Sequence, residues 1–570
     1  MRATRFHGAV SFNTRSYADG GGPGPTLRAR RGDKVLIALE NRLDFPTQAA
    51  VSWTGLQEQF SIMAAQCEPY SSPNVTSLHF HGLTISTGQA ADNPYRTCSP
   101  QETIQYEFHI LEDHPSGTFW YHPHADESNS LQTAGLMGGM FVVEDVDAHA
   151  DTDVEATMSY IRNFDDDVLL FQWQSLQSSF LNVDFLSRCA HSAMPVEQVA
   201  FENATGNDFI NVNGVYKPAK RMVAGVFQRW RLANGCMHRY VGMSIPDTCE
   251  AYAIAADGVY YDQPRSMSYV LVTLGSRIDL LVRCSESSEF WSEKVPWETD
   301  DEATTIWGDD PGFYEHLLLT ADVSAAAAGD ATVEASDAFA ALCASGSAKL
   351  DSGYFDEDVE AASDDAATHD VVLSEYENAV TEWYTINDSV FTGRISRRVR
   401  LGQKQVWTIR HAPITWVGTT KNHNWHLHAY HFKVMKVVDA DGVEYTESPA
   451  GDWKAGDVRD TVSVPVEGYA VVEFVPVKYT GLVLHHCHIF NHETGGLKAM
   501  FAVVDCRDDT VAALKTALCE SPDRWAFTHL DDLETCIATI DYYCSNSAMA
   551  MTYDEAYWKL LEGDDMLSTQ

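Results

Sequence analysis

Residues 486–497 read HCHIFNHETGGL, a stretch that places three histidines around a single cysteine. His486 and His488 flank Cys487, and His492 follows it by five residues. On a β-strand, residues two apart lie on the same face, and the residue between them points to the other face. This stretch therefore predicts two metal sites on opposite faces of one strand, joined through the peptide bonds on either side of Cys487.

Three more His-x-His pairs occur in the chain. They are His79/His81, His122/His124 and His426/His428, and the stretch from about 158 to 320 contains none. Chance predicts roughly one such pair at this histidine content. Eight imidazoles are enough for a cluster of several metal ions, and imidazole binds copper, zinc, iron and nickel. Structural zinc, which needs four ligands, and packed histidines without metal are the alternatives. The pattern predicts two metal-bearing domains flanking a metal-free one.

The opposite face of the strand predicts a different kind of site. His423, three residues before His426, and His492 are available as partners for the Cys487 thiolate. Two imidazoles and one thiolate form the ligand set of blue, electron-transferring copper. We therefore expect His423, Cys487 and His492 to form a mononuclear site beside the histidine cluster.

Short apolar runs separated by Gly and Pro indicate an all-β fold of sandwiches or barrels. Examples lie at 35–39, 139–145, 277–284 and 460–477. Residues 321–370 are rich in Ala and hold twelve acidic residues but a single lysine, Lys349, which is typical of a solvated linker or insertion. We expect domain one at 1–148, domain two at 158–325, an acidic linker or insertion at 326–370, domain three at 371–510 and a partly helical C-terminal tail at 511–570.

The chain is strongly acidic. Its 39 Lys and Arg residues against 81 Asp and Glu residues give a net charge of −42. Nucleic acids and anionic membranes bind basic surfaces, so neither is expected as a partner. No run of about 18 uninterrupted apolar residues is present, so no membrane span is expected.

Cysteine usage and sequons indicate an oxidising compartment. Four of the twelve cysteines crowd the C-terminal end, at Cys506, Cys519, Cys536 and Cys544. Glycosylation sequons occur at Asn74, Asn203 and Asn387. The first residues, MRATRFHGAV, lack the apolar region of a signal peptide. We expect a mature or truncated form of an extracellular or secretory-pathway glycoprotein, and an intracellular protein is the alternative.

Four segments carry a resemblance to a known family. They are HFHG at 79–82, WYHPH at 120–124, HNWHLHAYHF at 423–432 and HCHIFNHETGGL at 486–497. Over residues 10–505 the chain resembles the multicopper oxidases, which include laccases, ferroxidases, ascorbate oxidases and bilirubin oxidases. The resemblance implies three cupredoxin-like Greek-key β-barrel or sandwich domains and four copper ions: one type 1, one type 2 and two type 3.

The resemblance also implies roles for the ligands. His423, Cys487 and His492 match the type 1 site, and His79 and His426 match the type 2 site. The type 3 pair corresponds to His81, His122, His124, His428, His486 and His488. The trinuclear cluster is then expected between the first and third domains. The axial type 1 residue falls ten positions after the cysteine, at Leu497, whereas Met500 lies three residues further on. The absence of a thioether at the axial position is expected to raise the reduction potential of the type 1 copper.

Two acids and one cysteine match further family positions. Asp92 and Glu493 correspond to carboxylates that supply protons to the cluster, although both could be surface acids in so acidic a chain. Cys98 corresponds to a cysteine that pairs with one near the C-terminus. The resemblance therefore implies a disulfide from Cys98 to one of the tail cysteines, with the connectivity open.

The chain departs from the family pattern at several positions. Asn424 follows His423 where the family has Pro, and Ala429-Tyr430 replaces Gly-His. Met237 stands where fungal laccases have an acid that holds phenols or arylamines. Met237 could equally be a packing residue. These changes leave the copper ligands intact but put the phenol pocket in doubt.

The expected function is that of a laccase-type oxidase, a copper-dependent oxidoreductase. It would act as a monomer, take single electrons from phenols or aromatic amines, and reduce O₂ to two waters. A metallo-oxidase acting on Fe²⁺, Mn²⁺ or Cu⁺ is the alternative, and it would need carboxylates beside His423 or His492. A copper-binding surface protein without turnover is disfavoured, because such relatives lose ligands and all of them are kept here.

Overall fold

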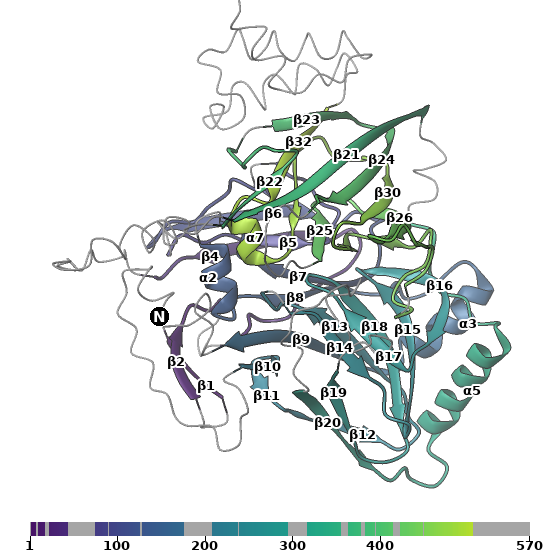
Figure 1. The fold of residues 1–570 in the computed structure, drawn as a ribbon. Helices are drawn as coiled ribbons and strands as arrows, with labels where there is room; N and C mark the ends of the chain where they lie inside the picture. The colour runs from purple at the N-terminus through teal and green to yellow at the C-terminus, as the bar shows by residue number, and fades with distance from the viewer. Residues whose placement is uncertain are drawn as a thin grey trace, which may run out of the picture.

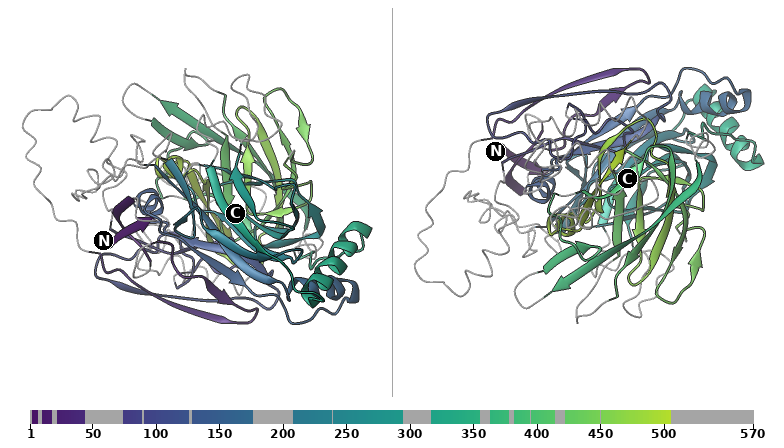
Figure 2. Two further views of the ribbon diagram at one scale, coloured as in Figure 1. Left: turned by 90° about the horizontal axis from the view of Figure 1, so that it is seen from below. Right: turned by 90° about the horizontal axis from the view of Figure 1, so that it is seen from above.

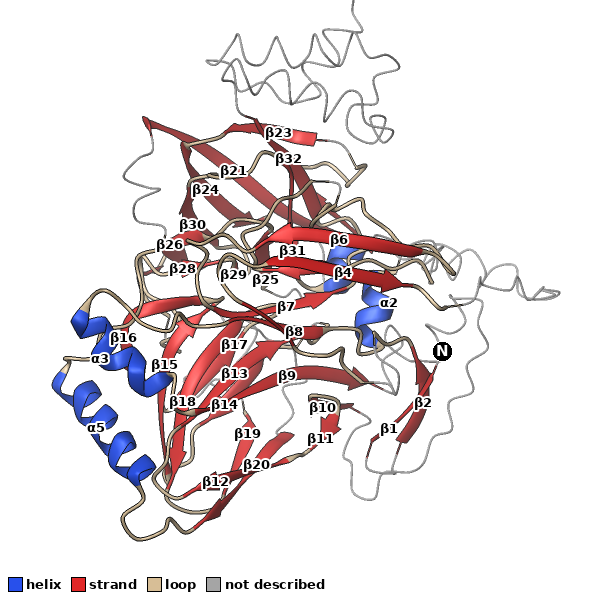
Figure 3. Cartoon of the chain, turned by 180° about the vertical axis from the view of Figure 1, so that it is seen from behind, coloured by secondary structure: helices blue, strands red, loops and turns tan. Residues whose placement is uncertain are grey.

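The computed structural model describes residues 2–6, 10–17, 22–43, 74–88, 90–125, 128–175, 208–237, 239–293, 316–354, 363–377, 382–393, 395–413, 422–448 and 450–504. Strands dominate these residues, as the cartoon in Figure 3 shows. The predicted all-β fold is therefore confirmed. In the described part of the chain, no helix is both long and apolar enough to cross a membrane.

The first group of strands spans residues 27–143. One sheet joins, in spatial order, β3 (Leu27–Ala29), β8 (Gly139–Val143), β7 (Gly117–His122) and β5 (His79–His81). Beside it, β4 (Lys34–Glu40) pairs with β6 (Thr103–His109). A separate hairpin joins β1 (Arg2–Phe6) to β2 (Val10–Thr14). Phe80, Phe119 and Phe141 fill the core of this group.

The second group forms two sheets. The larger joins β11 (Val215–Tyr216), β10 (Asp208–Val212), β9 (Asp165–Ser175), β13 (Gln228–Asn234), β18 (Arg277–Cys284), β15 (Cys249–Ala256) and β16 (Val259–Ser266). The smaller joins β12 (Ala219–Val223), β20 (His316–Ser324), β19 (Ser288–Ser292), β14 (Val241–Ser244) and β17 (Tyr269–Val272). A disulfide links Cys249 to Cys284, which are register partners on β15 and β18.

The third group also forms two sheets. One joins β22 (Glu382–Ile386), β21 (Ser363–Glu377), β24 (Gln403–His411), β30 (Tyr469–Phe474), β26 (Phe432–Val438) and β27 (Glu444–Tyr445), with β28 (Val458–Arg459) on β26. The other joins β23 (Ile395–Arg400), β32 (Lys498–Val504), β31 (Gly481–Cys487), β25 (His423–Leu427) and β29 (Thr461–Val464). Figures 1 and 2 show the three groups side by side.

Most of the helical structure lies outside the sheets. Helices α3 (Thr152–Ile161) and α5 (Ala331–Ser345) pack together at one edge of the molecule (Figures 1 and 3). Asp330 caps α5 by accepting a hydrogen bond from the Thr332 amide, and Phe339 is fully buried against Phe227. The expected linker at 326–370 thus contains a docked helix and, from Ser363, the start of β21. Its composition shows neither, because Ala is both a good helix former and common in linkers.

The expected disulfide of Cys98 is not present. Cys98 is a buried free thiol, 3.4 Å from the carbonyl oxygen of Glu102. The tail at 511–570 and its cysteines lie outside the described residues, as does Asn203. Asn74 is buried, and its Oδ1 accepts a hydrogen bond from Arg15. Asn387 is exposed, but its side chain bonds the backbone of Asp370 and Val372. Glycosylation therefore stays a prediction.

Strand register brings the histidine pairs together. On β5 and β7, His79 lies opposite His122. On β25 and β31, His426 lies opposite His486 and Trp425 lies opposite Cys487. Of the four pairs, His79/His81 lies wholly on a strand. The other three strands end at His122, Leu427 and Cys487, so His124, His428 and His488 follow just past the strand ends.

Candidate metal centre

The eight histidines of the four pairs form one buried cluster between the first and third groups of sheets. Each of them is at most 7% exposed. The ring of His79 stacks on that of His428 at 3.8 Å between centroids, and His81 stacks on His426 at 3.7 Å. The structure therefore brings the first-group and third-group pairs into direct contact.

Hydrogen bonds fix which nitrogen of each ring faces the cluster. Nδ1 of His486 donates to the carbonyl oxygen of Cys487 at 2.9 Å, and Nδ1 of His122 donates to that of Pro123 at 3.0 Å. Nδ1 of His426 donates to the Asp460 carbonyl oxygen at 2.8 Å. A neutral imidazole has one N–H and one lone pair. In each ring, Nε2 is thus left as a lone pair.

These lone pairs converge. Nε2 of His486 lies 3.2 Å from Nε2 of His124 and 3.1 Å from Nε2 of His428. Nε2 of His488 lies 3.2 Å from Nδ1 of His81. Within the described residues, Nε2 of His79, His122 and His426 makes no hydrogen bond although it is buried. Buried polar atoms are ordinarily bonded, so a group of converging lone pairs without hydrogen bonds fits a metal cation.

The electrostatics of the cluster suit a metal cation. Burial, reinforced by neighbouring imidazoles, lowers the pKa of His122, His124, His428 and His488 well below its usual value. The same causes lower the pKa of His486 to about 3. The rings are therefore neutral at physiological pH, which is the form that binds metal. Copper fits an all-imidazole donor set of this kind.

The mononuclear group assembles as its spacing predicts. Sγ of Cys487 lies 3.6 Å from Nδ1 of His423 and 3.9 Å from Nδ1 of His492, and the two Nδ1 atoms are 3.4 Å apart. All three residues are buried. Burial raises the pKa of the Cys487 thiol to about 12. Thiolate character at this position thus depends on a bound cation.

Leu497 and Met500 lie in different apolar clusters. Leu497 is fully buried in the cluster that contains Cys487, and its carbonyl oxygen accepts the Cys487 amide at 3.0 Å. Met500 packs with Ile395, Leu482 and Leu484 instead. Leu497, but not Met500, therefore shares the surroundings of the thiol.

Aromatic rings cover the two type 1 histidine candidates. Tyr384 stacks on His492 at 4.5 Å between centroids, and His411 stacks on His423 at 4.6 Å. The carboxylate of Glu375 lies beside both, with Oε1 3.4 Å from Nδ1 of His492 and 3.7 Å from Nε2 of His423. Sequence reasoning missed all three residues, because they come from β21, β22 and β24 and carry no local motif.

Both predicted carboxylates contact the histidine cluster. Asp92 accepts from Nδ1 of His79 at 2.9 Å and from the Phe80 amide at 3.2 Å. Glu493 is fully buried, 3.5 Å from Nε2 of His124 and 3.6 Å from Nδ1 of His486. Burial raises the pKa of Glu493 well above its usual value, although Asn129 on α2 (Asn129–Ala134) donates to it at 2.7 Å. Neither acid is a surface group.

A third carboxylate, Asp460, was not predicted. Its Oδ1 lies 3.2 Å from Nε2 of His81 and accepts from Arg277 at 2.9 Å. Gly275, two residues before Arg277, has φ +74°, and a Cβ there would lie 2.8 Å from the rings of His81 and His488. Glycine therefore lets the middle group of sheets approach the cluster closely.

The departures from the family pattern fall around the cluster. Met237 is buried in the core, and its carbonyl oxygen accepts from the Phe490 amide at 3.1 Å. Phe490 begins α7 (Phe490–Thr494), the helix that carries His492 and Glu493. Met237 is thus a packing residue at this position.

The other two departures adjoin ligand candidates in the chain, His423 and His428. Asn424 donates to the Leu274 carbonyl oxygen. Ala429 adopts φ +60°, a conformation that glycine takes without strain.

Comparisons with known proteins agree with this geometry. Two models of multicopper oxidase domains match the chain, one over residues 9–66 and 71–147 and one over residues 364–506. The multicopper oxidase mco of Staphylococcus epidermidis is 24% identical over 505 residues, which cover 88% of this chain and 86% of that protein.

Two solved structures share the fold. A Campylobacter jejuni multicopper oxidase, described as a metallo-oxidase, gives a TM-score of 0.57 at 17% identity and covers 87% of this chain and 90% of its own. A laccase-like multicopper oxidase of Ochrobactrum sp. gives 0.58 at 19% identity, covering 87% and 96%. The predicted cupredoxin-like fold is confirmed. The chain belongs to the multicopper oxidase family, whose members are copper-dependent oxidoreductases that use O₂ and a reductant.

Proposed function

We propose that the chain is a laccase-type oxidase that takes electrons singly from phenols or aromatic amines. His423, Cys487 and His492 would hold the type 1 copper, with Leu497 in the axial position. His79 and His426 would hold the type 2 copper. The type 3 pair would take His81, His122 and His488 on one side and His124, His428 and His486 on the other. Bound copper supplies the one-electron redox chemistry that couples donor oxidation to reduction of O₂ to two waters.

One observation carries the oxidase assignment. Cys487 contributes to the mononuclear group, while its chain neighbours His486 and His488 contribute to the histidine cluster. The two groups are therefore joined through a few covalent bonds of β31. A protein that only stored copper would have no need of such a connection. This arrangement supports electron transfer from one group to the other.

Glu375 supports a phenolic donor. Met237 stands where fungal laccases have an acid, and its side chain cannot accept a proton. Glu375 instead places a carboxylate oxygen 3.4 Å from Nδ1 of His492, one of the type 1 ligands proposed here. When a phenol loses one electron, its hydroxyl proton becomes strongly acidic. The Glu375 carboxylate would accept that proton and leave a neutral phenoxyl radical, which is ordinary general-base chemistry.

The test compares donors that do and do not release a proton. In the Glu375→Gln variant, kcat/KM for 2,6-dimethoxyphenol should fall at least about tenfold. The rate with tetramethyl-p-phenylenediamine, which gives up an electron without a proton, should stay the same. Glu444→Gln, at an exposed position paired with Lys436, is the matched control. An equal fall for both donors would mean that Glu375 acts on the site as a whole and accepts no proton.

The same carboxylate allows a second candidate function. A carboxylate beside the type 1 histidines is what a metallo-oxidase needs to hold Fe²⁺ or Mn²⁺, and the net charge of −42 would attract cations. In that case Glu375→Gln would raise the KM for Fe²⁺ about tenfold while phenol oxidation stays unchanged. O₂ uptake with each donor distinguishes the two candidates.

Glu493 and Asp92 would assist the supply of the protons that O₂ reduction consumes, each in a different way. Glu493 is buried against ligands of one type 3 copper, and Asp92 holds the type 2 ligand His79. Asp92 orients its histidine, as carboxylates behind metal-bound imidazoles do. Glu493 would deliver protons at the cluster.

We also place the protein in an oxidising compartment. The Cys249–Cys284 disulfide supports this, because such bonds persist where thiols are not kept reduced. Mass analysis of the secreted protein before and after enzymatic removal of N-glycans tests the secretory route. If the mass does not change, the Cys249–Cys284 disulfide alone supports the oxidising compartment.

A further inference from the structure

The third group of sheets contains a cavity of about 510 Å³. It lies between β23 and β32 on one side and β21 and β24 on the other. Mostly exposed residues between 387 and 392 form its mouth, and buried residues form its floor. None of the described residues that line it is a metal-ligand candidate. A cavity of this size accommodates a small organic molecule.

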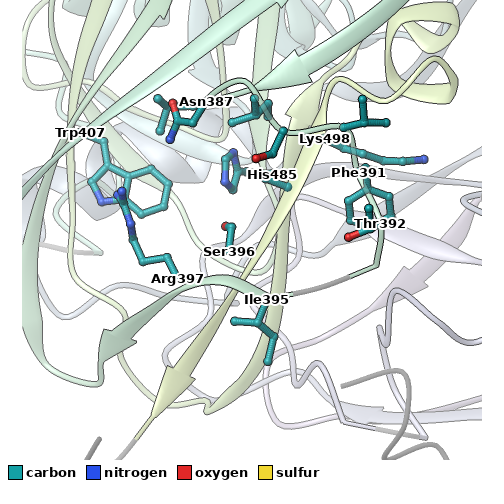
Figure 4. Close-up of a pocket in the computed structure, with 14 residues that line it drawn as sticks. Asn387, Phe391, Thr392, Ile395, Ser396, Arg397, Trp407, His485 and Lys498 are labelled. Atoms are coloured by element: carbon teal, nitrogen blue, oxygen red, sulfur yellow. The ribbon is translucent and has the colours of Figure 1, made fainter. Parts of the chain in front are cut away.

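The floor of the cavity is mainly apolar. Five of its residues are apolar and at most 8% exposed: Val371, Ile386, Ile395, Trp407 and Ala499. The two polar floor residues are His485 and Lys498. Lys498 lies at one end, where its Nζ is 5.0 Å from the centre of the Phe391 ring (Figure 4). The polar group in the middle of the floor is therefore the His485 imidazole.

This imidazole brings a hydrogen-bond donor into the cavity (Figure 4). Nε1 of Trp425 donates to Nδ1 of His485 at 3.2 Å. Because Nδ1 is the acceptor, the hydrogen of the ring is on Nε2. Within the part of the chain that the structure describes, this Nε2 has no hydrogen-bond partner, although His485 is only 3% exposed. Buried polar groups are ordinarily hydrogen-bonded, so this N–H marks where a ligand would place an acceptor atom.

A single donor on an apolar floor favours one kind of acceptor. A carbonyl oxygen accepts the His485 N–H and has no hydrogen of its own that needs a partner. A hydroxyl would also have to bury its O–H, and burying a polar group without a hydrogen bond costs free energy. A carboxylate would exchange the hydration of a full charge for this one N–H of the floor, which costs more.

Aromatic rings surround the donor. The Trp407 ring lies 5.4 Å from the His485 ring between centroids, at an interplanar angle of 75°. On the same side, the guanidinium carbon of Arg397 is 5.6 Å from the centre of the Trp407 ring. Phe391 lines the other end (Figure 4). A ligand with a flat aromatic body would bury its surface against these rings and the aliphatic floor.

We propose that this cavity binds a small neutral aromatic carbonyl compound, a ketone or an aldehyde, separately from the copper sites. The His485 N–H donates to the carbonyl oxygen, and the aromatic ring of the ligand lies against Trp407 and the aliphatic floor. Trp425 orients the donor, because its indole N–H holds Nδ1 of His485 as the acceptor. The ligand is bound and released unchanged.

Calorimetric titration of the copper-loaded protein with acetophenone tests the proposal. Acetophenone has a ring and a carbonyl but no hydroxyl or amine, so the proposed oxidase reaction does not consume it. It should bind saturably at one site per chain. Ethylbenzene, which has a similar shape but no carbonyl oxygen, should bind at least about fivefold more weakly. Acetone, which lacks the ring, and benzoate, which carries a charge, should bind at least about tenfold more weakly.

Two variants and one control assign the site. His485→Phe keeps a ring but removes the N–H, so acetophenone binding should weaken at least about fivefold while ethylbenzene binding stays within about twofold. Val390 is 50% exposed at the mouth, and Val390→Trp should obstruct it and weaken both ligands at least about tenfold. Val443→Trp, at a position that is 49% exposed and outside the cavity lining, is the matched control and should bind both ligands like the wild type.

Four results would overturn the proposal. The first is the absence of saturable acetophenone binding. The second is an equal affinity for ethylbenzene, acetone or benzoate, which would show that the site does not recognise a neutral aromatic carbonyl. The third is equal weakening of acetophenone and ethylbenzene in His485→Phe, which would show that His485 does not hold the carbonyl oxygen. The fourth is unchanged binding in Val390→Trp, which would place the ligand outside this cavity.

Discussion

Oδ1 of Asp460 lies 3.2 Å from Nε2 of His81, although 379 positions separate the two residues in the chain. Arg277 of the middle group of sheets holds Asp460 by a hydrogen bond of 2.9 Å, and the Asp460 carbonyl oxygen accepts from His426. All three groups of sheets therefore meet at this carboxylate. It fixes which nitrogen of His81 carries the proton and turns the other nitrogen toward the cluster.

Replacing Asp460 by Asn should weaken copper binding at the cluster. The amide of the new side chain would no longer match both His81 and Arg277, and loss of such a contact behind a ligand typically costs about 10–100-fold in metal affinity. Copper content after dialysis against a graded chelator measures the change. Asp441→Asn, at an exposed position, is the control. Unchanged copper retention in Asp460→Asn would mean that His81 is oriented by its packing alone.

The sequence predicts the histidine cluster because strand geometry is strictly local. A His-x-His pair on a strand presents two rings to one face, as His79/His81 does on β5. In the other three pairs the second histidine lies just past the end of its strand, and its ring still reaches the cluster. The roles of Asp92 and Glu493 followed from the family resemblance, and the structure places both beside predicted ligands.

What the sequence could not predict depends on contacts between distant segments. Asp460, Arg277 and Glu375 reach the site from separate strands and loops, and no spacing rule links them to a histidine. The Cys98 pairing was wrong, because Cys98 is a free thiol. The Cys249–Cys284 pairing was missed, because it depends on the register of β15 with β18. Helix α5 was not predicted for a similar reason. Phe339 is buried because α5 packs against residues that are distant in the sequence, such as Phe227.

Replacing Cys487 by Ser should abolish the blue colour and oxidase activity while leaving a folded protein. The hydroxyl of serine is a poor ligand for a site built from two imidazoles and a thiolate. Copper analysis should show the loss of one ion per chain, and circular dichroism should be unchanged. Retained activity toward a phenol would contradict the assignment of Cys487 to the type 1 site.

Replacing Glu493 by Gln should slow O₂ reduction more than donor oxidation. Gln keeps the size of the side chain and can still accept from Asn129, but it has no proton to deliver. General acid catalysis contributes about 100-fold or more, so the reoxidation step should slow by about that factor. Stopped-flow mixing of the reduced enzyme with O₂ measures this step by itself. Equal slowing of reduction by the donor would argue for a structural role.

Replacing Leu497 by Met should lower the potential of the type 1 copper. A thioether in the axial position donates to the metal and stabilises its oxidised form. Redox titration of the blue absorption measures the potential. Met500→Leu is the control, because Met500 packs in a different apolar cluster and should not affect the copper. An unchanged potential in Leu497→Met would place another residue in the axial position.

Asp257 should contribute acid-sensitive stability. Burial raises its pKa, but Arg459, 2.7 Å away, and Arg277 outweigh that effect and lower the pKa to about 2, from 3.8 for an unperturbed side chain. Asp460 and His431 also face this residue. Because the folded-state pKa is the lower one, the ionised carboxylate stabilises the fold above pH 3.8. This stabilisation is lost as the pH falls through about 2.

The difference between wild type and Asp257→Asn isolates this contribution. The free energy of unfolding in urea should fall by about 2 kcal/mol more in wild type than in the variant between about pH 4 and pH 2. Copper-free protein is needed, because protonation of the ligands would otherwise release the metal over the same range. Asp441→Asn should follow the wild type. Parallel curves for wild type and Asp257→Asn would show that the two arginines do not hold the carboxyl group in its ionised form.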